Sequence, residues 1–294
     1  MGGIVRIAGS MSRTPGDLPP GDRGGTTYAR PVSPAAPDSE RSSTDADRLV
    51  FDPIRAGGTL VEIVDLGRIS YDDALAVQRR RRDAVVEQRT SGGGMAILLL
   101  EHDPAVVTVT RRPAAASHVL ASPEMLAARG VQLRETDRGG DVTWHGPGQV
   151  VAYAILDLPR FGLRVGSHMR LLEQVVIDAI DRHGLGGRRD PGATGVWIGE
   201  GPTAAKIAAM GVRVGRGVSM HGLALNVDCD LSHFGLIVPC GLAGRPVTSL
   251  AKELGAAAPS VAEVKRGLAA AFARRLGELA VDPDGGAPGD VGRS

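Results

Sequence analysis

Two residues of rarely used types, Cys240 and Lys206, are the first candidates for chemistry in this chain. The 294 residues include two cysteines, and only three of the 34 basic residues are lysines. Lys206 lies in a run of small apolar residues (204–209), where a desolvated amine can release and regain a proton as Arg cannot. An ionised thiol is a strong nucleophile, and a neighbouring ammonium favours the thiolate. On different strands the two could meet, and the pair predicts an acyl-transfer enzyme.

Each of these residues also has a structural interpretation. Cys240 lies between Pro239 and Gly241, which suits a thiol at a turn, but a lone cysteine is also commonly a buried structural residue. Lys206 could instead extend from a strand to water. The other thiol, Cys229, lies between two aspartates that would raise its pKa, so it is the weaker candidate nucleophile.

The segment 138–149 is the densest candidate binding loop. Four glycines in twelve residues cost conformational entropy unless the backbone turns sharply or approaches another group closely. Arg138, Thr143, Trp144 and His145 add hydrogen-bond donors, a flat apolar wall and a titratable ring. The alternative is an ordinary connection between strands, although loops on a rigid sheet often carry sites. No Gly-Lys-Ser/Thr follows, which excludes a phosphate-binding loop of that type.

Metal and serine-hydrolase chemistry are not supported by the motifs. His145 and His221 have no third ligand at a recognisable spacing, and neither cysteine lies in a zinc pattern, so no metal site is expected. His221 itself is better explained as a core histidine on a strand. No Gly-x-Ser-x-Gly elbow is present.

Composition predicts a soluble cytoplasmic protein. The chain is 43% hydrophobic, with a formal net charge of +1 that gives no field for nucleic acid or an anionic membrane. No apolar run approaches the roughly 18 residues of a membrane span, and residues 1–10 are too short and glycine-broken for a signal peptide. Two cysteines without a CxxC pattern suit a reducing compartment.

The sequence divides into three parts. Residues 1–58 are rich in Pro, Gly, Ser, Asp and Arg without an apolar period, which is typical of disorder, and 282–294 resemble them. Residues 59–281 are expected to form one catalytic domain.

Apolar patterns within this domain alternate between strand and helix. Ser70 with Asp73, and Ser260 with Glu263, predict helix starts. The expected architecture is α+β, a mixed or largely antiparallel sheet with helices packed on one face. Strands are expected at 60–66, 96–100, 105–110, 131–136, 149–156, 195–198, 205–214 and 218–227, and helices at 70–89, 123–129, 167–183 and 260–279.

Four blocks, taken together in their order and spacing, resemble the lipB-type octanoyltransferases of lipoate synthesis. They are 138–149, 206–208, 221–227 and 239–241, and the resemblance extends over about residues 60–279. It implies the fold of biotin and lipoate protein ligases and a monomeric, cytoplasmic enzyme without a cofactor or metal. Such an enzyme transfers octanoyl from the phosphopantetheine of acyl carrier protein to a lysine on a lipoyl domain. The implied acceptors are 2-oxoacid dehydrogenase E2 subunits and the glycine-cleavage H protein.

The resemblance also implies roles for individual residues. Cys240 matches the cysteine that carries the acyl thioester, and Lys206 matches the lysine that lowers the pKa of that thiol. Trp144 replaces the usual Tyr and Ala209 a frequent Ser, which leaves the shape of the pocket open. The implied substrate-binding residues are Arg138, Gly139, Gly140, Asp141, Val142, Thr143, Trp144, His145, Ala209, Met210, Gly211, Gly222, Leu223 and Ala224.

Two other functions remain open from the sequence. An ATP-dependent lipoate or biotin ligase on the same fold would need a basic Gly-Arg-rich nucleotide loop, for which Gly215-Arg216-Gly217 is too short a match. A non-catalytic protein that docks carrier or lipoyl domains would leave Cys240 inert. The preferred acyl-chain length, the preferred acceptor, the oligomeric state and any role of residues 1–58 are not set by any of these motifs.

Overall fold

The computed structural model describes residues 51–56, 59–238 and 245–279. Cys240 and the turn predicted around it lie outside the described residues. So do most of the extension at 1–58 and the whole tail at 282–294.

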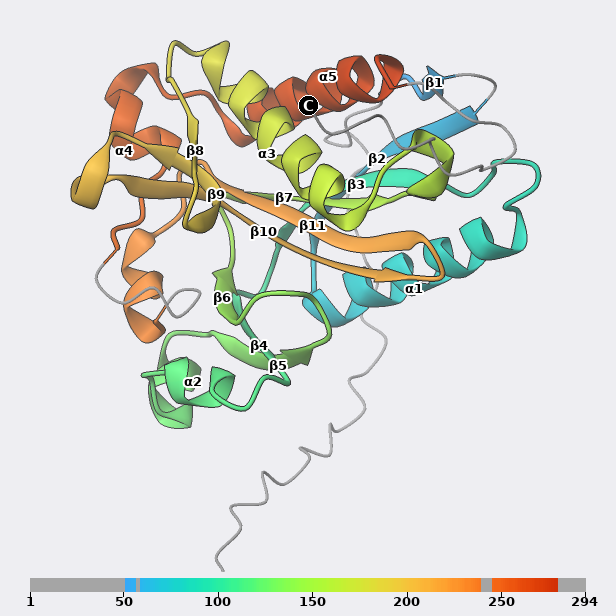
Figure 1. The fold of residues 1–294 in the computed structure, drawn as a ribbon. Helices are drawn as coiled ribbons and strands as arrows, with labels where there is room; N and C mark the ends of the chain where they lie inside the picture. The colour runs from blue at the N-terminus through green and yellow to red at the C-terminus, as the bar shows by residue number, and fades with distance from the viewer. Residues whose placement is uncertain (1–50, 57–58, 239–244, 280–294) are drawn as a thin grey trace, which may run out of the picture. The chain divides into compact units, whose positions relative to one another are not determined.

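Eight strands form the main sheet, which is mostly antiparallel (Figure 1). Their order across the sheet is β1-β2-β3-β7-β11-β10-β9-β8, and only β2 and β3 pair in parallel. The α+β fold class predicted from the sequence is confirmed. The strands are β1 (Ile54–Ala56), β2 (Thr59–Ile69), β3 (Ala96–His102), β7 (Gln149–Ile155), β8 (Arg188–Asp190), β9 (Ala193–Ile198), β10 (Ala205–Gly215) and β11 (Val218–Asn226).

A second, smaller sheet lies beside the main one and has its own core. It contains β4 (Val106–Thr110), flanked by β5 (Gln132–Thr136) in parallel and β6 (Val142–His145) in antiparallel orientation. Trp144 is fully buried in this small core. The small sheet therefore fixes the loop 138–149 through β6, which the sequence pattern had not indicated as a strand.

Five α-helices complete the described fold. Ser70 Oγ accepts from the Asp73 N–H, and Ser260 and Glu263 form a capping box, so both predicted helix starts are confirmed. The helix expected from Ser167 begins earlier, because Ser167 Oγ accepts from the Arg164 N–H and so occupies the third helical position. The helices are α1 (Tyr71–Glu87), α2 (Pro123–Ala128), α3 (Val165–Asp181), α4 (Leu250–Leu254) and α5 (Val261–Gly277), with 3₁₀ turns at Ala115–His118, Pro159–Phe161, Gly201–Thr203, Leu231–Leu236 and Gly255–Ala257.

Helices cover both faces of the main sheet, and the expectation of one covered face was wrong. Figure 1 shows α3 and α5 together on one side of the strands and α1 on the other. The reason lies in β7 and β11, whose residues are buried without alternation and therefore need cover on both sides. α1 supplies part of the cover on the side that carries the small sheet.

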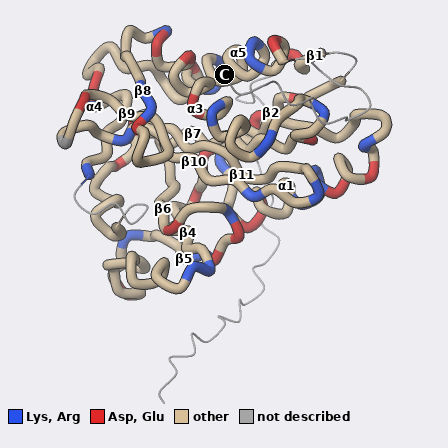
Figure 2. Tube along the Cα trace, viewed as in Figure 1, with Lys and Arg blue, Asp and Glu red and all other residues tan. Residues whose placement is uncertain are grey.

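Charge is distributed over the whole described fold. Figure 2 shows Lys and Arg on both sheets and the helices, with Asp and Glu among them. None of the described helices has the length and apolar character needed to cross a membrane.

Candidate active site

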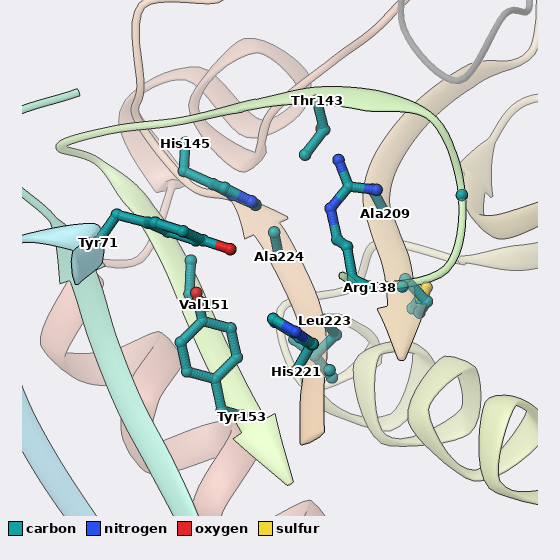
Figure 3. A pocket seen from close by; sticks show the side chains of 14 residues that line it. Tyr71, Arg138, Thr143, His145, Val151, Tyr153, Ala209, His221, Leu223 and Ala224 are labelled. Carbon is teal, nitrogen blue, oxygen red and sulfur yellow. The ribbon is translucent and has the colours of Figure 1, made fainter. Parts of the chain in front are cut away.

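A pocket of about 480 Å³, counted with its solvent-open space, lies between the main sheet and the loop 138–149 (Figure 3). Strands β7, β10 and β11 form one wall, and β6 with the preceding loop forms another. The first residue of α1 closes a third side. The lining residues are Tyr71, Arg138, Gly140, Thr143, His145, Val151, Tyr153, Ala209, Met210, Gly211, His221, Gly222, Leu223 and Ala224.

The pocket brings together most of the predicted substrate-binding residues from segments far apart in the sequence. All six residues of 209–211 and 222–224 line it, because β10 and β11 are neighbours in the sheet with Gly211 opposite Gly222. From 138–145 it includes Arg138, Gly140, Thr143 and His145.

Four predicted residues of the same loop do not line the pocket. Side chains alternate along β6, so Thr143 and His145 face the pocket while Val142 and Trp144 enter the small core. There Trp144 stacks on His233, with ring centroids 5.1 Å apart. The departure from Tyr at position 144 therefore affects the small core rather than the pocket wall.

Gly139 and Asp141 shape the loop from outside the pocket. The Gly139 N–H donates to Val212 O at 2.8 Å, and a Cβ added to Gly211 would come within 2.8 Å of Gly139 O. This close approach of two backbones is a reason for glycine at 211. Asp141 Oδ2 lies 2.5 Å from His118 Nδ1, which ties the loop to the 3₁₀ turn Ala115–His118.

Two tyrosines that the sequence analysis had not identified line the pocket, and a fully buried histidine, His102, lies behind one of them. The Tyr71 hydroxyl donates to Thr136 Oγ1 at 2.7 Å. The Tyr153 hydroxyl lies 2.6 Å from His102 Nε2, and His102 Nδ1 donates to Ile69 O at 3.2 Å. Because that carbonyl can only accept, His102 Nε2 must accept from the Tyr153 hydroxyl. Burial lowers the pKa of His102 to about 4 and raises that of Tyr153 well above its ordinary value, so both groups are neutral at pH 7.

The rarity of tyrosine could have indicated these residues. The chain has three tyrosines, and two of them line this pocket. Because aromatic residues make up only 3% of the chain, each tyrosine is a candidate for a special role, by the argument already used for lysine.

A line of hydrogen bonds runs from the pocket to the far end of β11. His145 Nδ1 lies 2.7 Å from Gln149 Oε1, Gln149 Nε2 donates to Asn226 Oδ1 at 2.9 Å, and Asn226 Nδ2 donates to Thr248 O at 2.9 Å. Burial, and then the nearby His102, keep the pKa of His145 well below its ordinary value. The imidazole of His145 is therefore also neutral.

His221 lies at the edge of the pocket, with a left-handed backbone. Its φ of 61° is unusual for a residue with a side chain, and Gln78 Oε1 accepts its N–H at 2.7 Å. Its Nε2 lies 2.8 Å from Asp137 Oδ1, and Arg213 contacts the other carboxylate oxygen. The His221 hydrogen bond, with the charges of both partners, holds the pKa of Asp137 well below its usual range. No three His, Cys, Asp or Glu side chains gather as metal ligands within the described ranges.

Lys206 lines a second pocket, of about 310 Å³ by the same measure, which adjoins the first. Thr143, Ala209 and Ala224 belong to both. Lys206 is 7% exposed, donates from Nζ to Thr194 O at 3.0 Å, and lies 4.8 Å from the centroid of the Trp197 ring. The amine is thus sheltered and held beside the pocket lined by the other predicted residues.

The described residues on either side of 239–244 contact the 3₁₀ turn Ala115–His118 before the segment, and strands β8, β9 and β10 after it. Before this segment, the Val238 N–H donates to His118 O at 2.7 Å. After it, the Arg245 guanidinium lies 3.7 Å from the centroid of the Trp197 ring and 2.7 Å from Asp190 Oδ2. The Lys206 N–H donates to Pro246 O at 2.9 Å, which pairs residues 246–248 with β10.

Cys229 has the character of a structural thiol. It is buried in the small core, and burial, with a further contribution from Asp228, raises its pKa to about 12. The thiolate is therefore scarce at neutral pH, which agrees with its ranking below Cys240.

The fold is that of lipoate ligases. A bipartite lipoate protein ligase from Thermoplasma acidophilum superposes with a TM-score of 0.57 at 17% identity, covering 78% of this chain and 87% of that one. A lipoate-protein ligase A bound with ATP superposes with a TM-score of 0.55 at 15% identity, covering 74% of this chain and 84% of that one. At such low identity these likenesses define the fold alone.

Sequence similarity defines the family. The lipoyl protein ligase A/B catalytic domain family matches residues 70–273. An octanoyltransferase of Chloroflexus aurantiacus is 54% identical over 172 residues, which are 58% of this chain and 74% of the relative. An octanoyltransferase of Christiangramia forsetii is 48% identical over 154 residues, which are 52% of this chain and 66% of the relative. The chain belongs to the lipoyl protein ligase A/B catalytic domain family, within its lipB-type octanoyltransferases, and is an acyltransferase.

Proposed function

We propose that this enzyme transfers an octanoyl group from acyl carrier protein to a lysine of a lipoyl domain, through a thioester on Cys240. The observation that carries the proposal is the sheltered Lys206 amine in a pocket that adjoins a second, larger pocket lined by most of the predicted substrate-binding residues. The identity to named octanoyltransferases supports the acyl group.

The larger pocket suits an alkyl chain. Its tyrosine hydroxyls have partners behind the wall, Thr136 for Tyr71 and His102 for Tyr153. The charged Arg138 donates to Thr108 Oγ1 and to the carbonyls of Gly139 and Asp141. The tyrosine rings, together with Val151, Leu223 and Ala224, therefore offer carbon atoms to a ligand. Burying a methylene contributes about 0.8 kcal/mol, so the octanoyl chain beyond its carbonyl could contribute about 5 kcal/mol.

In the first step the Cys240 thiolate attacks the thioester carbonyl of the donor. A new C–S bond forms to Cys240, the C–S bond to phosphopantetheine breaks, and the departing thiolate takes a proton from the Lys206 ammonium. One thioester replaces another, so the exchange is nearly isoenergetic and requires no ATP. The enzyme then holds an octanoyl thioester and a neutral Lys206.

In the second step the neutral ε-amine of the target lysine attacks this thioester. A C–N bond forms, the C–S bond to Cys240 breaks, and the amine gives a proton to Lys206, which restores the thiolate and the ammonium. A free lysine has a pKa of about 10.4 and is rarely neutral at pH 7, so the target first loses one proton to solvent, and Lys206 then takes the second proton, which the attack releases. The amide product is lower in energy than the thioester, which drives the reaction forward.

The partners in this proposal follow the chemistry. The donor is octanoyl-acyl carrier protein, and the acceptors are lipoyl domains of 2-oxoacid dehydrogenase E2 subunits and the glycine-cleavage H protein. The enzyme acts as a cytoplasmic monomer and needs neither a cofactor nor a metal.

Transfer rates of Cys240→Ser and Lys206→Arg test the proposal. Cys240→Ser should lose nearly all transfer from octanoyl-carrier protein to a lipoyl domain, since a hydroxyl is a far weaker nucleophile at neutral pH. Lys206→Arg keeps the charge but not the proton exchange, so transfer to the acceptor amine should slow at least about 100-fold, as for loss of a general base. Undiminished rates in both variants would refute the Cys/Lys mechanism.

A reaction with ATP distinguishes the proposed transferase from an ATP-dependent ligase on the same fold. Wild-type enzyme with free octanoate, ATP and a lipoyl domain, but no carrier protein, should give no octanoylated domain. Product in that mixture, retained in Cys240→Ser, would instead identify an adenylate-forming ligase.

A further inference from the structure

The peptide group between Thr194 and Gly195 lies between a buried carboxylate and the Lys206 amine. Its carbonyl, Thr194 O, accepts from Lys206 Nζ at 3.0 Å. Its amide, the Gly195 N–H, donates to Glu173 Oε1 at 3.1 Å. A single peptide unit therefore connects Glu173 to Lys206 through two hydrogen bonds.

Glu173 is the most buried carboxylate among the described residues. It is 1% exposed on α3, the helix that packs over β9 and β10. Its second oxygen, Oε2, accepts from Arg170 at 2.6 Å and from Arg189 at 3.1 Å. Both arginine side chains are partly exposed, which lets them carry their charge near water while the carboxylate faces β9. Burying a carboxylate costs free energy unless it is hydrogen-bonded, and here the Gly195 N–H supplies one of the compensating bonds.

The geometry of a trans peptide aligns these bonds. The C=O and N–H of one unit point in opposite directions, and the peptide between 194 and 195 is trans. A carboxylate on the N–H polarises the unit and makes its carbonyl a stronger acceptor. The stronger acceptor at Thr194 O stabilises the Lys206 ammonium and restricts its position.

The local backbone has the form that this arrangement needs. Gly195 has a φ of 133°, and a Cβ there would come within 2.7 Å of Ala208 O and 3.2 Å of Lys206 Cε. Glycine at 195 thus leaves room for the Lys206 side chain to pass along β9 toward Thr194 O. Helix α3, β9 and the side chain of Lys206 meet at this one peptide.

We propose that Glu173 is a positioning residue for Lys206, acting through the Thr194–Gly195 peptide to hold the amine as an ammonium in one place. The proposal rests on the proposed function, in which that ammonium favours the Cys240 thiolate. It assigns to α3, which does not line either pocket, a part in the chemistry of the site.

Other charged groups near this unit are accounted for. Arg170 and Arg189 bind Glu173 directly. Arg245 shares the Trp197 ring with Lys206, and its charge is balanced by Asp190 at 2.7 Å. Changing Glu173 alone therefore leaves the Arg245–Asp190 pair in place.

The pH dependence of Cys240 alkylation by iodoacetamide tests the proposal. Glu173→Gln keeps the size and an acceptor for the Gly195 N–H but removes the charge. The midpoint of alkylation should move upward by about one pH unit, which corresponds to about a tenfold lower rate at pH 7 if that pH lies below the midpoint. The reacted thiol is assigned by peptide mass, so that Cys229 is counted separately. A purely structural role for Glu173 would lower the melting temperature without moving this midpoint.

Two further variants make every outcome decisive. Asp178→Asn changes another carboxylate of α3, one that binds Arg274 and Arg275 and has no bond to β9, and should leave the midpoint unchanged. Lys206→Ala should move the midpoint upward. A wild-type midpoint in Glu173→Gln, with a shifted one in Lys206→Ala, would overturn the role of Glu173 alone. Unshifted midpoints in both would instead contradict the Cys/Lys pair of the proposed function.

If Glu173→Gln does not fold, the double variant Glu173→Gln/Arg189→Gln provides the same measurement. It removes the carboxylate together with the less exposed of its two cationic partners, so that little uncompensated charge stays near the core. The same upward shift is expected, and a wild-type midpoint would again overturn the role of Glu173.

Discussion

Lys206, which the sequence indicated by its rarity, is held in one position by contacts of its side chain and its backbone. Its amine donates to Thr194 O and lies over Trp197, and its backbone pairs with the segment that follows residues 239–244. The sequence indicated Lys206 because arginine supplies nearly all other positive charge. The sequence did not indicate Gly195 or Trp197, because their roles depend on a strand pairing that places residue 197 opposite residue 206.

Gly195→Ala should impair transfer by displacing this side chain. A Cβ at 195 would meet Ala208 O at 2.7 Å, and a φ of 133° disfavours any residue other than glycine. We expect a loss of about 1–3 kcal/mol in the free energy of unfolding and a fall of at least about tenfold in octanoyl transfer. Both are measured on the purified variant by denaturation and by single-turnover kinetics.

Gly199→Ala is the matched control for this change. Gly199 also has a positive φ, 78°, but the nearest atom to an added Cβ is 3.9 Å away. It should lose stability while keeping its transfer rate. Equal losses of transfer in both variants would show that strain, rather than the position of Lys206, causes the effect.

At the scale of elements, β6 explains which parts of the predicted binding loop reach the pocket. The glycine-rich composition of 138–149 predicted a loop, and a strand of four residues is too short to appear as a period in the sequence. Once Val142–His145 is a strand, alternation sends Trp144 to the small core and His145 to the pocket. Long strands such as β7 and β11 were predictable because their apolar runs are long and each begins directly after a glycine. The short strands β1 and β8 were not.

Ala224→Val tests the alignment of the two pockets. Ala224 lines both, and added methyl groups there should narrow the passage between them. An octanoyl chain has four more methylenes than a butyryl chain, worth up to about 3 kcal/mol when buried. The variant should lose most of the preference for octanoyl over butyryl donors, measured as the ratio of kcat/KM values.

The control for this variant is Ala154→Val on β7, a fully buried alanine that lines neither pocket. Overpacking at Ala154 should lower the free energy of unfolding by about 1–3 kcal/mol. It should slow both donors alike. If Ala224→Val kept the wild-type preference, the alkyl chain would not lie in the larger pocket.

At the scale of the whole molecule, the fold class and the principal elements were predictable, but their arrangement was not. Local patterns gave the strands, the helices and two caps at Ser70 and Ser260. They could not show that α1 and the small sheet cover the face opposite α3 and α5, because no local pattern tells which side of a sheet a helix takes. The pocket exists only through that arrangement, which is why Tyr71 at the start of α1 was not foreseen in it.

The stability of the molecule should depend on buried neutral histidines. His168 on α3 is fully buried, and neither ring nitrogen has a hydrogen-bond partner among the described residues. Burial lowers its pKa to about 4, whereas an unfolded chain would have a value of about 6.5. Between these pH values the unfolded state binds a proton that the folded state does not. The free energy of unfolding should therefore fall as the pH falls from about 6.5 to 4, by up to about 1.4 kcal/mol per pH unit.

His168→Leu should reduce that slope, as measured by urea denaturation at several pH values. His183→Leu, just beyond the end of α3, serves as the control and should keep the wild-type slope. An unchanged slope in His168→Leu would mean that its imidazole does not remain neutral in the folded protein.

The intact mass of the enzyme after mixing with octanoyl-acyl carrier protein tests the Cys240 thioester most directly. The wild-type protein should gain one octanoyl group, lose it when a lipoyl domain is added, and Cys240→Ala should gain none. An unmodified wild-type mass during active transfer, or an octanoyl adduct that persists in Cys240→Ala, would contradict a thioester on Cys240.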